Sequence, residues 1–308
     1  MNPNECLKRI LQLQTFDDGD REMVDLRQRR KDIEKLLRSQ FSAASPRIRG
    51  AGSIAKGTMI RESYDLDIAC YFARDDNAAG STLEEIYNNA VEALSREYQV
   101  ERKPSAIRVR DAKKADLHVD VVAGRFTDES EGDVFLHRTT GEKDRLKTNL
   151  QVHIDHIKDS GCVDAIRLMK LWKVRNGLTN AKTFVLELLV VKLLDEKKGQ
   201  SLSKQLESIW REFRDNPESL AVEDPANSNN ILKPALDLCR NQLATVAGNT
   251  LWQIENGATE IAGWTKVFGP LDDNDGTQNS GVGPSRIDSM RTAVSSVVTP
   301  TKPWCEGR

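Results

Sequence analysis

The spacing of hydrophobic residues along the chain changes near residue 46 and again near residue 148. Apolar residues at positions 26, 33, 36 and 37 share one side of a helix, which predicts a long amphipathic helix in the N-terminal region. From Pro46 the pattern becomes a series of short β-like runs separated by Gly, Asp and Asn. These runs predict a mixed sheet and one accompanying helix, with strands at 47–49, 66–72, 100–109 and 117–122 and the helix at 82–97.

After Thr148 the helical period dominates, and the expected helices span 151–176, 183–197, 203–214, 233–242 and 250–267. Beyond Pro270 the chain is rich in Gly, Ser, Asp, Asn and Thr and has few large apolar residues, which predicts a partly flexible tail. The expected fold class is α+β, with a sheet lobe followed by a helical lobe. We expect three regions, namely the N-terminal helix with the sheet lobe at 1–147, the helical lobe at 148–271 and the tail at 272–308.

Composition narrows the class of protein. Of the 308 residues, 38% are hydrophobic and 30% are charged, so the chain can bury a sizeable core. The net charge is only −2, which argues against an obligatory nucleic-acid partner or an anionic membrane surface. The five cysteines are scattered, as is typical of reduced thiols, and the most apolar stretch, 184–194, is short and contains Glu187 and Lys192. We therefore expect a cytoplasmic protein with no membrane partner.

Two carboxylates with a spacing of two residues are the strongest chemical signal. On a strand, Asp65 and Asp67 would point from the same face, while Leu66 and Ile68 would point into the core. A cation stabilises such a pair, and Mg²⁺ prefers carboxylate and phosphate oxygens. The tripeptide Asp-x-Asp also occurs in surface turns, so it does not establish a metal site by itself.

A third acid, Asp120, lies in an alternating, β-branched run that predicts a mostly buried strand. A buried carboxylate needs a partner, and a strand beside the one bearing Asp65 and Asp67 would bring three carboxylates around metal ions. Asp116 and His118 share the parity of Asp120. We interpret Asp116 as the exposed start of the strand and His118 as a hydrogen-bonded structural histidine.

Gly52 and Ser53 precede the acids and suit a phosphate cradle, because glycine lets backbone amides approach a ligand and the serine hydroxyl adds a donor. An ordinary turn would look the same. The run 50–55 also fits the loose dinucleotide-binding fingerprint. A charged helix before this run and a carboxylate-bearing strand soon after it disfavour the parallel βαβ unit that the fingerprint requires.

The order Gly-Ser, Asp-x-Asp and then a distant strand Asp resembles the polymerase-β-type nucleotidyltransferases. The segments 167–173, 182–189 and 223–230 resemble the helical lobe of the oligoadenylate-synthetase and cyclic GMP-AMP-synthase branch. This resemblance covers about residues 20–270, and the compact size and missing zinc insertion are most similar to the bacterial CD-NTases, the nucleotide cyclases of CBASS anti-phage operons. It implies a polymerase-β-like nucleotidyltransferase lobe and a helical lobe, with NTPs between them and the long N-terminal helix bracing both.

The resemblance also implies an activity. The chain would join NTPs, either ATP or GTP or both, into a cyclic di- or trinucleotide and release pyrophosphate, using two Mg²⁺ ions for which Mn²⁺ can substitute. Asp65, Asp67 and Asp120 inherit the role of catalytic metal ligands. Gly52 and Ser53 would hold the triphosphate.

The resemblance extends to residues of the helical lobe. Lys170 and Thr183 would steady the triphosphate, and Phe184 would stack on a base. Spacing places Lys170 on or beside an apolar stripe, so that it should face the cleft. Lys173 has nearly the same angular position and is the alternative, and a further interpretation is that both side chains extend to solvent. Asp224 would close a loop over the nucleotide and read a base edge, or would form an ordinary turn and cap.

Two other functions stay open at this point. A template-independent nucleotidyltransferase that extends RNA would share the acids but would need a long basic path for the RNA. A non-catalytic NTP-sensing module would keep the fold while the acids do not cooperate.

The basic residues at 102, 103, 108, 110, 113 and 114 are typical of a solvated hairpin face, with a regulatory or substrate-binding patch as the alternative. The resemblance to defence cyclases also implies that a regulatory protein partner could control the activity. The sequence does not indicate the oligomeric state, the bases used, the linkage between them or the activating signal.

Overall fold

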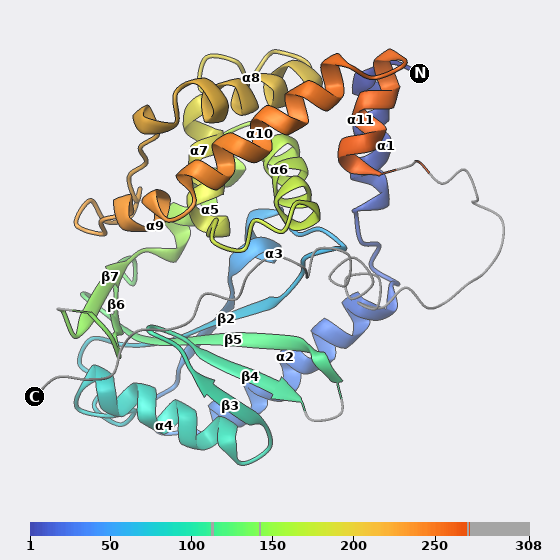
Figure 1. The fold of residues 1–308 in the computed structure, drawn as a ribbon. Coiled ribbons are helices and arrows are strands. Elements are labelled where there is room, and N and C mark those ends of the chain that lie inside the picture. The colour runs from blue at the N-terminus through green and yellow to red at the C-terminus, as the bar shows by residue number, and fades with distance from the viewer. Residues whose placement is uncertain (112–113, 142, 270, 272–308) are drawn as a thin grey trace, which may run out of the picture. The chain divides into compact units, whose positions relative to one another are not determined.

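A mixed sheet forms the centre of the first lobe in the computed structural model, which describes residues 1–111, 114–141, 143–269 and 271 (Figure 1). Its strands are β1 (Arg47–Gly50), β2 (Leu66–Phe72), β3 (Gln99–Arg102), β4 (Ile107–Asp111), β5 (Lys114–Phe126), β6 (Val134–His137) and β7 (Arg145–Thr148). The main path runs in the order β1-β2-β5-β4-β3, and β6 and β7 continue from β5. β2 and β5 are parallel, whereas the other described pairs are antiparallel.

Two helices cover the face of this sheet that lies away from the second lobe (Figure 1). They are α2 (Arg21–Gln40) and α4 (Leu83–Ser95). Alternate residues of the central strands, such as Ile68 and Val121, are buried against them. The apolar stripe predicted for the N-terminal helix enters the same core through its residues 26, 33 and 37.

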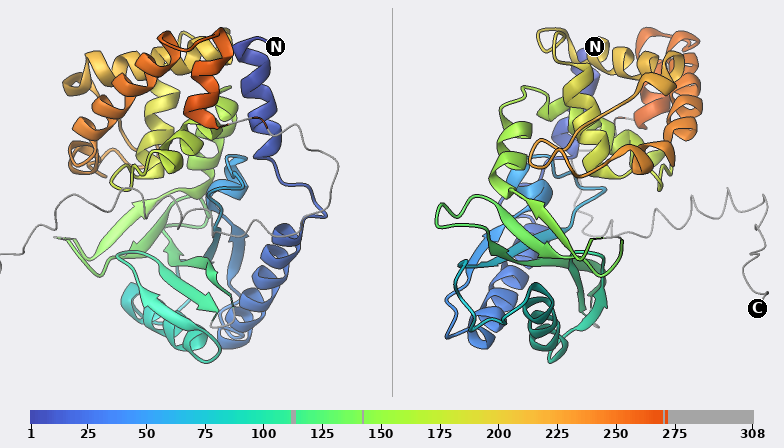
Figure 2. Two further views of the ribbon diagram at one scale, coloured as in Figure 1. Left: turned by 45° about the vertical axis from the view of Figure 1, so that its right-hand side comes forward. Right: turned by 90° about the vertical axis from the view of Figure 1, so that its left-hand side faces the viewer.

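The second lobe consists of helices around an aromatic core. Trp172, Trp210 and Trp264 are fully buried, and the ring centroids of successive pairs lie 6.0 Å and 5.8 Å apart. The helices are α1 (Pro3–Leu13), α5 (Leu150–Lys158), α6 (Val163–Arg175), α7 (Thr183–Leu193), α8 (Leu202–Asp215), the 3₁₀ turn η1 (Pro217–Ser219), α9 (Lys233–Asp237), α10 (Arg240–Glu255) and α11 (Glu260–Phe268). The two views of Figure 2 show this helical layer on the side of the sheet opposite α2 and α4.

Several helix boundaries differ from those expected. The helix expected at 151–176 is two helices, because Gly161 adopts a left-handed φ of 71° between α5 and α6. The helices expected at 233–242 and 250–267 are α9, α10 and α11, with α10 spanning the expected gap. The bracing expected of one N-terminal helix is divided between two, since α1 packs against α6, α8 and α11 while α2 packs against β2 and α4.

The expected fold class is confirmed, because a mixed sheet with helices is joined to a helical lobe. The tail expected at 272–308 lies outside the described residues. Within the part of the chain that the structure describes, no helix combines the length and the apolar character needed to cross a membrane.

Candidate active site

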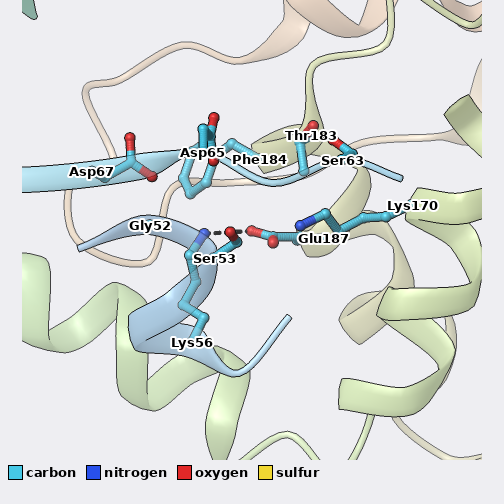
Figure 3. Close-up of a pocket in the computed structure, with 10 residues that line it drawn as sticks. All are labelled: Gly52, Ser53, Lys56, Ser63, Asp65, Asp67, Lys170, Thr183, Phe184 and Glu187. Atoms are coloured by element: carbon cyan, nitrogen blue, oxygen red, sulfur yellow. Dashed lines mark hydrogen bonds and ion pairs between the residues drawn. The ribbon is translucent and has the colours of Figure 1, made fainter. Parts of the chain in front are cut away.

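A cavity of about 140 Å³ lies where the two lobes meet (Figure 3). The sheet lobe contributes α3 (Gly52–Lys56) and the residues that lead into β2, and the helical lobe contributes α6 and the start of α7. The cavity is lined by Gly52, Ser53, Lys56, Ser63, Asp65, Asp67, Lys170, Thr183, Phe184 and Glu187. Both lobes therefore supply polar side chains to one space.

Asp65 and Asp67 reach this cavity because of the two-residue period of the strand. Leu66 between them is buried in the sheet core, so the two carboxylates share the opposite face. β2 pairs with β5 in parallel, and in that register Asp67 lies directly beside Asp120. The three acids predicted from the sequence thus lie on two adjacent strands, although Asp120 is not among the residues that line the cavity.

The negative charge of Asp67 is only partly compensated by the positive groups around it. Burial, together with the negative charges of Asp65 and Asp120, raises the pKa of Asp67 to about 7, although Lys56 and Lys170 lower it. A divalent cation would relieve this repulsion, and carboxylate oxygens are the ligands that Mg²⁺ prefers. The chemistry of these donors therefore fits a magnesium site, and Asp65 and Asp67 present two of them to one cavity.

The carboxylate of Asp120 is engaged with an arginine. Arg108 on β4 donates from Nε to Asp120 Oδ1 at 2.8 Å and from Nη2 to Asp120 Oδ2 at 2.7 Å. Among the described residues, no group of three or more His, Cys, Asp or Glu side chains is arranged to hold a metal ion. Arg108 departs from the solvated hairpin face expected of these basic residues, because only 23% of its side chain is exposed, whereas that of Arg110 is 49% exposed.

Two features of the structure require a glycine at position 52, namely its backbone conformation and the side chain packed beside it. It adopts a φ of 60°, and a Cβ atom placed on it would lie 1.6 Å from Oδ2 of Asp67. The backbone also ties the two segments together, since the N–H of Ala51 donates to the carbonyl oxygen of Asp67 at 2.9 Å. Any side chain at position 52 would thus displace the carboxylate of Asp67.

Ser53 follows on the same wall of the cavity. Its Oγ is buried and has no hydrogen-bond partner within the described part of the chain. A buried hydroxyl without a partner is costly, so a group that satisfies it belongs to the working site. The predicted role of Ser53 in holding phosphate agrees with this observation.

The structure places Lys170, Thr183 and Phe184 on the cavity wall, and the binding roles that the resemblance implies for them stay predictions. Lys170 is 4% exposed, its Nζ donates to the carbonyl oxygen of Thr58 at 2.7 Å, and burial lowers its pKa. The alternative, Lys173, is not among the lining residues and donates from Nζ to Thr183 Oγ1 at 3.0 Å. Of the two lysines, Lys170 is the one whose side chain reaches the cavity.

Three lining residues, Lys56, Ser63 and Glu187, were missed by the sequence analysis. Glu187 is 1% exposed and accepts a hydrogen bond from Lys56 Nζ at 2.5 Å (Figure 3). It also accepts one from Thr58 Oγ1 at 2.9 Å. Lys56 Nζ also lies over the ring of Phe184, 5.9 Å from its centroid. The signal for Glu187 was a lone carboxylate in an apolar helical run, and for Lys56 it was a basic residue one turn after Gly52.

Asp224 does not line the cavity. It is 5% exposed, and its carboxylate is held by His153 Nε2 at 2.8 Å, Asn230 Nδ2 at 2.7 Å and the N–H of Ala226 at 2.9 Å. Although burial raises the pKa of Asp224, these hydrogen bonds hold it below its ordinary value. The turn that was the alternative for this residue is therefore present, and it connects to the site through the His153 ring, whose centroid lies 5.1 Å from that of Phe184.

His118 lies at the edge of the acidic region. Its Nε2 is 3.9 Å from Asp65 Oδ2, and burial, followed by the charge of Arg108, lowers its pKa. A neutral imidazole fits the structural role predicted for it better than the role of a charged partner. The side chain of Asp116 lies outside the described residues.

Solved structures of bacterial CD-NTases share this fold. CdnC of Escherichia coli MS115-1, solved as a CdnC:HORMA-deltaN complex, matches with a TM-score of 0.62 and 22% identity over 88% of this chain and 98% of CdnC. CdnG of Bradyrhizobium diazoefficiens, solved with GTP, matches with a TM-score of 0.68 and 13% identity over 87% of this chain and 96% of CdnG. DncV of Vibrio cholerae, solved with the linear intermediate 5′ pppA(3′,5′)pG, matches with a TM-score of 0.58 and 17% identity over 77% of this chain and 71% of DncV.

No model of a protein family and no curated protein matches the chain. The similarity to the solved structures spans both lobes, because it covers most of this chain and most of CdnC and CdnG. At these low sequence identities, what it shows is the fold. The chain has the fold of CdnC, CdnG and DncV, a mixed-sheet lobe joined to a helical lobe.

Proposed function

We propose that the chain is a Mg²⁺-dependent nucleotidyltransferase that joins NTPs into a cyclic di- or trinucleotide and releases pyrophosphate. One arrangement supports this most directly: Asp65 and Asp67 on the wall of the cavity, with Asp120 beside Asp67 in the adjacent parallel strand. The buried, unpartnered hydroxyl of Ser53 lies on the same wall. Carboxylates beside an unsatisfied donor suit a triphosphate with its metal ions.

Ser53, Lys56 and Lys170 would bind the triphosphate. Ser53 offers its free hydroxyl, and the two lysines bring positive charge from opposite lobes to one cavity. Lys56 is held by Glu187, which keeps its ammonium group within the cavity wall (Figure 3). Charge-assisted hydrogen bonds to phosphate are stronger than neutral ones, so these three residues would fix the position of the substrate.

Asp65, Asp67 and Asp120 would hold the metal ions. When bound, Mg²⁺ would supply the positive charge that lowers the pKa of the attacking ribose hydroxyl and stabilises the leaving pyrophosphate. The acids contribute position and charge. Gly52 contributes to the same metal site, because it leaves room for the carboxylate of Asp67.

The proposed reaction is a displacement at phosphorus. A ribose hydroxyl of one nucleotide attacks the α-phosphorus of another and loses its proton to solvent as the new phosphodiester bond forms. The bond from the α-phosphorus to the bridging oxygen breaks as pyrophosphate leaves. Phe184, packed against His153, offers its ring to a base. A second or third transfer on the linear product closes the ring.

The choice of substrate rests on the structural neighbours and on charge. CdnC has been solved with ATP, CdnG with GTP, and DncV with a linear intermediate built from both bases. The net charge of −2 argues against a long RNA path. We extend the proposal to a cytoplasmic role in anti-phage defence with a regulatory protein partner, which the CdnC:HORMA-deltaN complex supports.

The test is a product analysis. The purified chain is incubated with all four NTPs and Mg²⁺, treated with phosphatase to remove terminal phosphates, and examined by mass spectrometry. We expect a phosphatase-resistant species with the mass of a cyclic di- or trinucleotide, absent for the variant Asp65→Ala/Asp67→Ala. Linear oligomers would contradict cyclisation and indicate RNA extension, and NTPs left unchanged would contradict nucleotidyl transfer by the chain itself.

A further inference from the structure

The pairing of Arg108 with Asp120 is the feature of the site that the proposed reaction does not use. Residues 108 and 120 are directly opposed in the antiparallel β4–β5 pair. Both oxygens of the carboxylate accept from the guanidinium, at 2.8 Å and 2.7 Å. The two side chains are only 23% and 17% exposed, so water competes weakly for this fork.

Asp120 lies between a negatively charged neighbour and a positively charged one. On β2 its register neighbour is Asp67, and on β4 it is Arg108. Two carboxylates on adjacent strands repel each other when no cation separates them, so the arginine provides the positive charge that Asp120 needs. The side chain of Asp120 is accordingly absent from the cavity lining, and within the described residues no three acids converge on one point.

From these contacts we infer that Arg108 holds the third acid out of the metal site, and that a divalent cation must take Asp120 from the guanidinium before the site is complete. This inference rests on the proposed function, since it concerns the same three acids. One carboxylate has two competing partners, and the cation shifts the equilibrium by the difference in its affinity for the two arrangements. Arg108 therefore sets the metal concentration at which the three carboxylates come together.

If Arg108 had a purely supporting role, its removal would change the metal affinity in the opposite direction. If the guanidinium merely oriented Asp120 for the metal, its removal would leave a looser ligand and weaker metal binding. If it competes with the metal, its removal frees Asp120 and strengthens metal binding. The sign of the change in affinity decides between these two roles.

The first measurement is Mn²⁺ binding to the full chain, without nucleotide, by isothermal titration calorimetry. We expect Arg108→Gln to bind Mn²⁺ about five- to tenfold more tightly than the unchanged chain, and Asp120→Asn to bind it more weakly. Arg110→Gln is the matched control, because Arg110 is two residues along β4, pairs with Glu101 at 3.0 Å and lies opposite His118 rather than Asp120 in the β4–β5 register. It removes the same charge nearby and should change the affinity by less than about twofold.

A second measurement uses the unchanged chain and does not depend on the variants folding. The side-chain Nε–H resonance of Arg108, followed by ¹H–¹⁵N NMR, should shift as Mg²⁺ is added, and it should stay in place for Asp65→Ala/Asp67→Ala. A resonance that does not move at saturating Mg²⁺ would overturn the inference.

The calorimetric outcomes separate the inference from the proposed function. Equal or weaker Mn²⁺ binding by Arg108→Gln, with binding still dependent on Asp120, would overturn the inference and leave the metal site intact. An equal gain for Arg110→Gln would assign the effect to charge alone and would also overturn it. Absence of Mn²⁺ binding at millimolar concentration in every protein would contradict the metal site itself, and the inference with it.

Discussion

At the scale of single residues, the site depends on one close approach. The carboxylate of Asp67 occupies the space that a side chain at position 52 would need, and the backbone there has a positive φ. Ser53 lies beside it with a buried hydroxyl that no described residue satisfies. Neighbouring positions in the sequence thus carry different demands, a steric one at Gly52 and a hydrogen-bonding one at Ser53.

Gly52→Ala should therefore be more damaging than Ser53→Ala. The alanine Cβ would meet the Asp67 carboxylate and would also strain the backbone, so we expect product formation to fall by at least about a hundredfold, with a loss of stability of about 1–3 kcal/mol. Ser53→Ala removes one donor and should keep full stability while NTP binding weakens about tenfold. Thermal melts and NTP titrations of both variants check this, and equal effects of the two changes would contradict it.

The raised pKa of Asp67 gives a second prediction at this scale. Because its pKa in the folded chain is about 7, above the ordinary value of 3.8, its neutral form stabilises the metal-free fold at low pH, and this contribution is lost as the pH rises toward 7 and beyond. Between pH 5.5 and pH 8 the loss should be about 2 kcal/mol. The difference in unfolding free energy between Asp67→Asn and the unchanged chain, measured in EDTA, should therefore grow in favour of Asn over this range. A difference that is constant with pH would contradict the assignment.

At the scale of elements, the two lobes are joined at the cavity by a buried polar contact between α3 and α7. Glu187 on α7 accepts from Lys56 at the end of α3 and from Thr58 just beyond it. Lys170 on α6 donates to the carbonyl oxygen of the same threonine. This contact fixes the helix that bears Ser53 against the helix that bears Phe184.

Glu187→Gln should destabilise the chain. The substitution removes a buried negative charge that compensates Lys56, and breaking such a pair from one side costs about 3 kcal/mol. Glu92→Gln is the control, because Glu92 forms an exposed pair with Arg96 on α4 at 3.0 Å, and its loss should stay within about 0.5 kcal/mol. Chemical denaturation measures both values. Similar losses for the two variants would show that Glu187 does not carry the contact.

At the scale of the whole molecule, the sequence predicts features that depend on the spacing of residues within one segment. It misses features that depend on contacts between residues far apart in the chain. The range 66–72 of β2, the shared face of Asp65 and Asp67, and the helical character after Thr148 all follow from spacing within one segment, and the structure has them. The roles assigned to these acids remain predictions.

The rest required contacts between segments far apart in the chain. Lys56 and Glu187 are 131 positions apart, and neither has a spacing signal that indicates the other. Arg108 was grouped with solvated basic residues because a hairpin pattern does not reveal which charge will face an acid on the next strand. Helix ends such as the one at Gly161 depend on one backbone conformation that the hydrophobic period does not record.

The central claim is that Asp65, Asp67 and Asp120 form one metal-dependent active site for nucleotidyl transfer. The most direct test is the rate of pyrophosphate release from NTPs and Mg²⁺, without RNA, for the unchanged chain and for Asp120→Asn. Loss of a metal ligand should cost several kcal/mol of barrier height, so we predict less than about a tenth of the rate for the variant. Pyrophosphate release by Asp120→Asn at more than about a tenth of the unchanged rate would contradict the assignment of the third acid, and with it the account of the site.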